Sequence, residues 1–290
     1  MSNTYEALQK AHPCFGGHKN HAGRIHLPVS PGCNIGCRFC NRSMNDEEVR
    51  PGVTSKVLSP EEAMDVLEKA LTICPEITVA GIAGPGDTLA TDYALETFRL
   101  IKERYPRLLK CMSTNGLLLQ EKADEILKAG IDSLTVTVNA VRSEIGALLN
   151  DGIVYHDRYY TGAEAAEILI ENQLKGIRRI SEGGITVKVN SVLVPNLNGG
   201  HIEEIARTVK EAGASIYNII PLIPQGALSE ERAPVCAEID AARTAAGKYI
   251  DVFRHCQHCR ADAVGFLGGK DFGDMIYQRR IAGRETFSHG

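Results

Sequence analysis

Aromatic residues are scarce in this sequence: tryptophan is absent, and all aromatic residues together make up 6% of the 290 residues. No apolar run reaches the roughly 18 residues that a membrane-spanning helix needs, which excludes such a helix. The charges are nearly balanced, since 36 acidic and 32 basic residues give a formal net charge of −4. We therefore expect no binding to nucleic acid or to a membrane. Residues 1–10 lack a signal-peptide pattern, so we expect a cytoplasmic protein.

Strand-like and helix-like patterns alternate six times along the chain, which predicts parallel strands joined by right-handed helical crossovers. The predicted strands cover residues 24–30, 77–83, 108–113, 131–138, 185–194 and 215–220. Ser59, Pro60 and Glu62 predict the start of the first crossover helix, which ends before Pro75. The other helices are expected near residues 92–104, 121–129, 163–180 and 201–212. We predict an α/β fold, a partial (βα)6 TIM-type barrel, with a doubly wound sheet as the structural alternative.

The alternation is lost after Leu222, although residues 238–246 fit a further helix. We therefore divide the chain into an N-terminal extension (residues 1–24), a barrel (residues 25–225) and a C-terminal extension (residues 226–290). Both extensions contain cysteine. No linker indicates a separate second domain.

The chain has nine cysteines, an odd number that excludes complete disulfide pairing. In a reducing cytosol, clustered cysteines indicate metal binding or catalysis. Cys33, Cys37 and Cys40 lie in one short loop directly after the first predicted strand. Three such thiolates can bind three corners of a cubane iron–sulfur cluster and leave its fourth iron without a protein ligand. Most clusters are bound by four thiolates. A zinc site with a remote fourth ligand, or three packed cysteines, is the alternative.

This triplet at the end of a first barrel strand resembles the radical S-adenosylmethionine (SAM) superfamily. The resemblance implies a [4Fe–4S] cluster whose open iron binds the methionine amine and carboxylate of SAM. One electron from the reduced cluster then cleaves a carbon–sulfur bond and gives a 5′-deoxyadenosyl radical. Functional loops of barrels lie at the carboxyl ends of the strands, so we expect polar residues there to contact SAM. The candidates are Gly84, Asp87, Thr114, Asn139, Asn190 and Val192.

Further cysteines and a histidine have the chemistry of metal ligands. Cys256 and Cys259 form a C-x2-C pair, a good half-site for zinc or iron–sulfur. Cys14 precedes the first strand, and His26 and Cys111 lie on the first and third strands. A buried apolar role for Cys111 and a core role for His26 are the alternatives. Cys74 and Cys236 have no partner motif and are expected to pack.

Several blocks longer than a generic motif closely resemble the NifB family of nitrogenase cofactor biosynthesis, from about residue 12 to residue 268. Besides the triplet, these are residues 12–14, 24–26, 50–53, 81–87, 113–116, 158–162, 188–191 and 254–263. The chain looks like the stand-alone form without a further C-terminal domain. The resemblance implies an enzyme that fuses two [4Fe–4S] precursor clusters into a carbide-containing eight-iron core. One SAM donates the methyl group that becomes the carbide, and a second supplies the radical.

The resemblance also implies the ligands of the precursor clusters. His26 and Cys111 bind one cluster, and Cys14, Cys256 and Cys259 bind the other. Together with the Cys33, Cys37 and Cys40 triplet, His26 is counted among the catalytic residues. The implied partners are an electron donor such as a ferredoxin or flavodoxin, an iron–sulfur cluster donor, and scaffold or carrier proteins of the nitrogenase cofactor.

One position departs from the family pattern. Typical members have another cysteine shortly after the triplet, whereas residues 41–46 here contain none. Asp46 is a candidate substitute, because a carboxylate can bind iron. The alternatives are a divergent radical SAM enzyme with an auxiliary cluster that acts on an organic or peptide substrate, and a non-catalytic iron–sulfur carrier.

Overall fold

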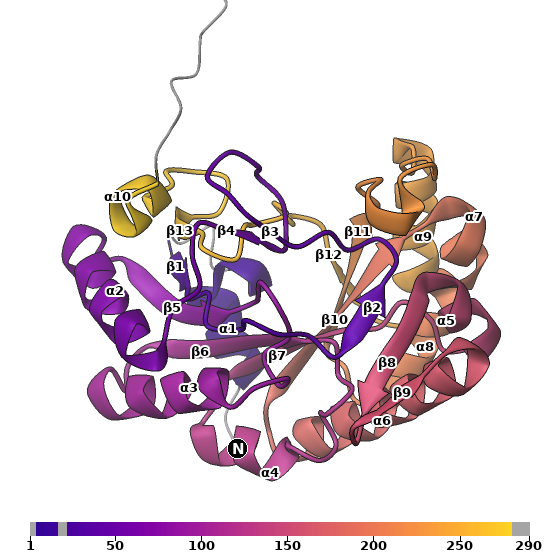
Figure 1. The fold of residues 1–290 in the computed structure, drawn as a ribbon, viewed down its shortest axis with the longest axis horizontal. Coiled ribbons are helices and arrows are strands. Elements are labelled where there is room, and N and C mark those ends of the chain that lie inside the picture. The colour runs from indigo at the N-terminus through magenta and orange to yellow at the C-terminus, as the bar shows by residue number, and fades with distance from the viewer. Residues whose placement is uncertain (1–3, 17–21, 280–290) are drawn as a thin grey trace, which may run out of the picture.

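The computed structural model describes residues 4–16 and 22–279. Its centre is an eight-stranded sheet with the order β12-β11-β10-β7-β6-β5-β1-β13 (Figure 1). All neighbours pair in parallel except β1 and β13, which are antiparallel. The strands are β1 (Gly23–His26), β5 (Ile77–Ile82), β6 (Leu109–Thr114), β7 (Ser133–Thr137), β10 (Thr186–Leu193), β11 (Ile216–Pro221), β12 (Asp251–Phe253) and β13 (Val264–Phe266).

The six predicted strands are confirmed, and they follow one another across the sheet in chain order. A doubly wound sheet would reverse its strand order at a switch point. The sheet therefore is a partial barrel, open between its edge strands β12 and β13. Helices cover its outer face (Figure 1). They are α2 (Pro60–Ile73), α3 (Tyr93–Arg104), α4 (Ala123–Ala129), α6 (Gly162–Glu182), α8 (Ile202–Glu211) and α9 (Cys236–Ala246).

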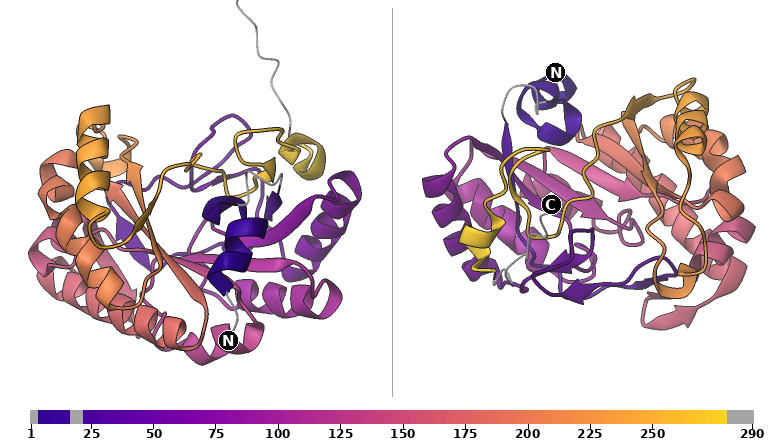
Figure 2. Two further views of the ribbon diagram at one scale, coloured as in Figure 1. Left: turned by 180° about the vertical axis from the view of Figure 1, so that it is seen from behind. Right: turned by 90° about the horizontal axis from the view of Figure 1, so that it is seen from above.

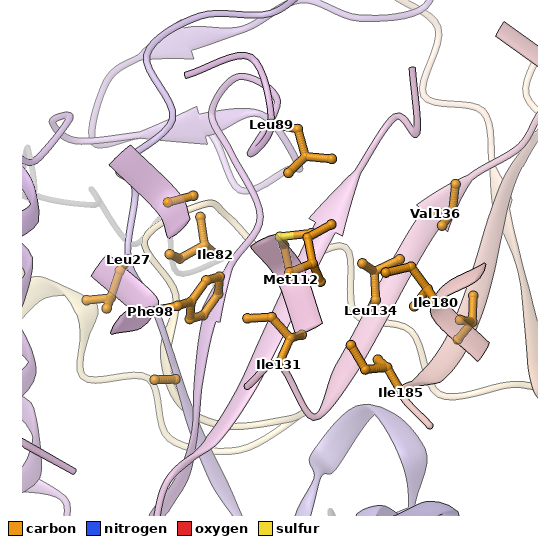
Figure 3. Packing of buried hydrophobic residues seen from close by; sticks show 14 of the residues in the cluster. Leu27, Ile82, Leu89, Phe98, Met112, Ile131, Leu134, Val136, Ile180 and Ile185 are labelled. Carbon is orange, nitrogen blue, oxygen red and sulfur yellow. The ribbon is translucent and has the colours of Figure 1, made fainter. Parts of the chain in front are cut away.

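Helix α2 shows how local chemistry sets these crossovers. The Ser59 hydroxyl accepts a hydrogen bond from the backbone N–H of Glu62 at 3.2 Å, and the Glu62 carboxylate accepts one from the backbone N–H of Ser59 at 2.8 Å. This capping box fixes the first turn. The apolar faces of the helices then pack on the sheet, where Phe98 of α3 lies beside Leu27 and Ile82 (Figure 3). No helix in the described part of the chain is both long and apolar enough to cross a membrane.

Both extensions pack against the barrel. In the N-terminal one, α1 (Thr4–Ala11) and the 3-10 helix η1 (Pro13–Phe15) bury Leu8 and Phe15 against the first residue of β11 and the last residue of β12. In the C-terminal one, residues 254–263 connect β12 to β13 and therefore cross from one sheet edge to the other. Figure 2 shows α1 and this segment near the open side of the barrel. The domain boundaries themselves remain a prediction.

Smaller elements complete the fold. A second sheet has the order β2-β8-β9, and β3 pairs with β4. These elements are β2 (Ile35–Cys37), β3 (Ser43–Met44), β4 (Val53–Thr54), β8 (Asn150–Tyr155) and β9 (Arg158–Tyr160). The remaining helices are α5 (Ser143–Leu149), α7 (Pro195–Asn198) and α10 (Gly273–Tyr277), with 3-10 turns at Gly199–His201 and Gly226–Leu228.

Candidate functional site

The three cysteines of the triplet line one cavity of about 210 Å³ at the carboxyl ends of the strands. Burial raises the pKa of the Cys37 thiol well above its ordinary value, and the neighbouring sulfurs of Cys40 and Cys33 raise it further. Three thiolates this close repel one another, so a positively charged group must offset their charge. The residues present therefore fit the iron core of a cubane cluster.

The loop that carries the triplet is held from the side by the second sheet. Its strand β2 pairs antiparallel with β8, with Cys37 opposite Asn150. Beyond the paired residues, the backbone N–H of Arg38 donates to the Leu149 carbonyl at 3.0 Å, and that of Val154 donates to the Asn34 carbonyl at 2.9 Å. These backbone bonds fix the spacing of the cysteines.

The loop after β5 crosses directly over the cysteine loop at Gly86. The backbone N–H groups of Gly86 and Asp87 donate to the carbonyls of Ser30 and Gly32, at 2.7 and 2.8 Å. A Cβ atom on Gly86 would lie 1.9 Å from the Gly32 oxygen. Only glycine therefore fits at position 86.

The buried carboxylate of Asp87 joins the loops after β5 and β6. It accepts hydrogen bonds from the backbone N–H groups of Leu89 and Asn115, at 3.0 and 2.5 Å. The Thr114 hydroxyl donates to it at 3.0 Å. Burial raises the pKa of Asp87, and these hydrogen bonds oppose the rise. The predicted residues Asp87 and Thr114 thus both line the cavity, and they also order its wall.

Two cavity residues were not singled out from the sequence. The Asn115 side-chain amide donates to Asn34 Oδ1 at 2.7 Å and lies 3.9 Å from Cys33 Sγ. Gln173 of α6 is buried and donates from Nε2 to the carbonyls of Asn115 and Thr137, at 2.6 and 2.8 Å. The sequence does contain one signal for Gln173, since a polar residue on the apolar face of a helix indicates a specific buried role.

Of the other residues predicted to contact SAM, Asn139 lines the cavity. Its Oδ1 accepts a hydrogen bond from the backbone N–H of Val192 at 2.8 Å. Asn190 accepts one from Asn218 at 3.1 Å. Among the residues that the structure describes, Gly84, Asn190 and Val192 lie beside the cavity lining rather than in it. Their contact with SAM stays a prediction.

A second group of candidate ligands lies on the strands. His26 of β1 is in register with Gly81 of β5, and Gly81 is in register with Cys111 of β6. A Cβ atom on Gly81 would lie 3.1 Å from His26 Cδ2. Glycine between these two residues leaves space in front of β5 on the face that carries both side chains.

His26 has the protonation state of a metal ligand. Its Nδ1 lies 3.0 Å from the Arg260 carbonyl oxygen, which can only accept, so Nδ1 carries the proton and Nε2 keeps its lone pair. Burial lowers the pKa of His26 to about 4, and the charge of Arg24 lowers it as well. The imidazole is therefore neutral at physiological pH, as metal binding requires.

Cys14, Cys256 and Cys259 are the other candidate cluster ligands. Cys14 and Cys256 pack against one apolar cluster, and Arg24 Nη2 donates to Cys259 Sγ at 3.2 Å. Burial raises the pKa of the Cys14 thiol to about 11; Lys188 opposes this rise, and Cys259 and Cys111 add to it. The fold thus brings Cys259 and Cys111 within electrostatic reach of Cys14, although about 250 residues separate Cys14 from Cys259 in sequence.

The loop that lacks the expected cysteine packs against the C-terminal segment. Arg260 is buried, donates to the Asn45 carbonyl at 2.7 Å, and forms an ion pair with Asp262 at 2.8 Å. Asp46 lies in this loop, and its binding to iron stays a prediction. In the described residues, no group of three or more histidine, cysteine or acidic side chains is placed so that it could hold a single metal ion. A cubane spreads its irons over several corners, so its ligands stand farther apart.

The fold and the cysteine loop define the class of radical SAM proteins. A sequence model of the Radical SAM superfamily matches residues 27–209. A radical SAM methyltransferase from Sphaerobacter thermophilus has the same fold, with a TM-score of 0.57 and 19% identity over 79% of this chain and 64% of that one. Membership of this class implies a [4Fe–4S] cluster and SAM.

Curated relatives show to which family within this class the chain belongs. The FeMo cofactor biosynthesis protein NifB of Methanocaldococcus infernus is 47% identical over 271 residues, 92% of this chain and 89% of the relative. NifB of Methanocaldococcus jannaschii is 45% identical over 264 residues, 90% of this chain and 87% of the relative. The chain therefore belongs to the NifB family of FeMo cofactor biosynthesis.

Proposed function

We propose that this radical SAM enzyme converts two [4Fe–4S] precursor clusters into the carbide-containing eight-iron core of the nitrogenase cofactor. SAM serves as the methyl source for the carbide and as the source of the 5′-deoxyadenosyl radical. The overall step is a methyl transfer to a cluster sulfide followed by radical-driven fusion, which is lyase-type cofactor biosynthesis. The relatives are named FeMo cofactor biosynthesis proteins. The two groups of candidate cluster ligands support the specific reaction proposed here, the conversion of two precursor clusters with SAM.

The residues around the cavity would hold SAM. Cys33, Cys37 and Cys40 would bind the resident cluster, which supplies, when bound, the electron that cleaves the carbon–sulfur bond of SAM. Asp87 fixes the backbone of the two loops that form the cavity wall. Asn115 supports the Cys33 side of the same wall.

The second group of ligands would hold the substrate. His26 and Cys111 would bind one precursor cluster, in front of Gly81. Cys14, Cys256 and Cys259 would bind the other. A neutral imidazole anchors iron more weakly than a thiolate, so the cluster on His26 can be released for fusion. The observation that supports the proposal is that one barrel carries both these candidate ligands and the cavity lined by Cys33, Cys37 and Cys40.

Anaerobic reconstitution tests the proposal. We expect the protein to bind about twelve irons per chain, as three cubane clusters require. On reduction with SAM it should release both S-adenosylhomocysteine, from methyl transfer, and 5′-deoxyadenosine, from the radical. About eight or four irons without S-adenosylhomocysteine would favour the divergent enzyme, and the absence of both products would indicate a carrier.

The partners follow from this chemistry and stay part of the proposal. An electron donor such as a ferredoxin or flavodoxin would reduce the cluster. An iron–sulfur cluster donor would load the precursors, and a nitrogenase cofactor scaffold or carrier would receive the product. Acceptance of the product by an apo-nitrogenase tests that last step directly.

A further inference from the structure

Lys188 of β10 is buried, with 7% of its surface exposed. Its Nζ lies 5.4 Å from the centre of the Phe15 ring and 5.3 Å from that of Phe253. Among the described residues, no carboxylate pairs with it and no acceptor hydrogen-bonds to it. Two aromatic faces stabilise an ammonium only in part. Because burial of a cation without an anion is strongly unfavourable, this position is suited to an anionic ligand.

Candidate cluster ligands lie near the two rings that face Lys188. Phe15 and Phe253, the two rings that face Lys188 Nζ, belong to the apolar cluster against which Cys14 and Cys256 pack. Asp262 is the carboxylate near His26, and Arg260 and Arg279 already neutralise it.

His12 adds an oriented donor to this group. The side chain is 2% exposed, and its Nδ1 accepts a hydrogen bond from the backbone N–H of Cys14 at 3.1 Å. The proton of the neutral ring is therefore on Nε2, which has no hydrogen-bond partner in the described part of the chain. A buried donor without a partner is costly unless a ligand satisfies it.

We propose that Lys188 is the buried counter-charge of the anionic iron–sulfur cluster held by Cys14, Cys256 and Cys259. Each thiolate adds a negative charge, so a cubane held by three of them is an anion, and its sulfides can accept the Nε2–H of His12. Lys188 then acts as a positioning residue that retains the substrate cluster. This inference rests on the proposed function, because the cluster is the substrate of that reaction.

The test compares Lys188→Met and Lys188→Arg with the wild-type chain after anaerobic reconstitution. We expect about twelve irons per chain in the wild type and in Lys188→Arg, and about eight in Lys188→Met. Where clusters remain, an iron chelator should remove iron about tenfold faster from Lys188→Met, which corresponds to ~1.4 kcal/mol. Reductive cleavage of SAM, which depends on the triplet, should persist in all three proteins.

Lys110→Met is the matched control. Lys110 is equally buried, on β6, but it has an anionic partner, Asp132, at 3.1 Å. Removing one member of a buried ion pair destabilises a protein. We therefore expect a Tm several degrees lower for the Lys110→Met apoprotein with an unchanged iron content. For the Lys188→Met apoprotein we expect a Tm equal to or above that of the wild type.

Four outcomes decide between these possibilities. Lower iron retention in Lys188→Met, restored by arginine and without a lower apoprotein Tm, supports the inference. Wild-type iron content and release rate in Lys188→Met overturn it, and so does iron loss that accompanies a lower Tm and is not restored by arginine. A wild-type chain that itself binds only about four irons would instead refute the proposed function.

Discussion

His26 and Cys111 lie on one rung of the sheet, two strands apart, and the residue between them is Gly81. Side chains in register on neighbouring parallel strands point to the same face. An imidazole and a thiol therefore stand on either side of a position without a side chain. This relationship supports the assignment of His26 and Cys111 to a shared cluster.

Filling that space should remove the cluster. In Gly81→Val, a β-branched side chain that suits a strand would occupy the space in front of β5. We expect the iron content to fall from about twelve to about eight per chain, while reductive SAM cleavage persists. His26→Ala, which adds no bulk, should lose the same four irons. Full iron content and unchanged methyl transfer in both variants would contradict the assignment.

Gly86→Ala should disrupt the cysteine loop. The added Cβ would lie 1.9 Å from the Gly32 oxygen, so two backbone segments must separate. We expect a loss of about 3 kcal/mol or more in the free energy of unfolding, together with loss of reductive SAM cleavage. Gly199→Ala is the control, since no atom lies within 4 Å of its Cβ position. Chemical denaturation of the apoproteins measures the free energy of unfolding of both variants. Equal stability of Gly86→Ala and Gly199→Ala would refute the crossing of the two loops.

Asp87→Asn tests the wall of the SAM cavity. An amide cannot accept all the hydrogen bonds that the carboxylate accepts from Leu89, Thr114 and Asn115. We expect a loss of about 1–3 kcal/mol in stability and weaker SAM binding by calorimetry. Asp92→Asn, at an exposed ion pair with Lys122, should change neither quantity measurably. Wild-type SAM affinity in Asp87→Asn would show that Asp87 does not order the wall of the SAM cavity.

The pH dependence of stability should reflect His201, which accepts a hydrogen bond from the backbone N–H of Val141 at 3.0 Å. Burial lowers the pKa of His201 below its ordinary value, although the Glu204 carboxylate opposes this. The unfolded chain therefore binds the proton first as the pH falls below about 6.5, and stability decreases toward acid pH. Glu144 raises this pKa and Arg142 lowers it, so both stay unchanged in the test.

The measurement is the apoprotein Tm between pH 7.5 and pH 5.5 for the wild type and for His201→Gln. The glutamine variant should be less stable at pH 7.5 but should lose less stability on acidification. If the two proteins have parallel pH profiles, the His201 hydrogen bond does not control the loop from Asn139 to Arg142.

The strands, the crossover helices and the cysteine triplet could be predicted because their signals are local. Apolar periodicity gives the six strands, and a capping box gives α2. The β8–β9 hairpin has no such signal, because His156 and Asp157 occupy its turn with positive φ angles of 48° and 58°. Glycine and asparagine are the usual markers of such turns.

The roles of Gly81, Gln173 and Lys188 could not be predicted, for a different physical reason. Each depends on strand register or helix packing, which a single strand or helix does not determine. Lys110 and Lys188 look alike in sequence, since each lies within a β-rich segment. The fold places one beside Asp132 and the other between two phenylalanine rings.

The most direct test of the account follows the methyl group of SAM. The reconstituted protein is reduced anaerobically with SAM labelled with 14C at that methyl group, and the isolated cluster product is assayed for label and for activation of an apo-nitrogenase. The account predicts a labelled product that activates, with S-adenosylhomocysteine and 5′-deoxyadenosine released alongside it. Release of 5′-deoxyadenosine alone, with an unlabelled and inactive cluster fraction, would contradict it.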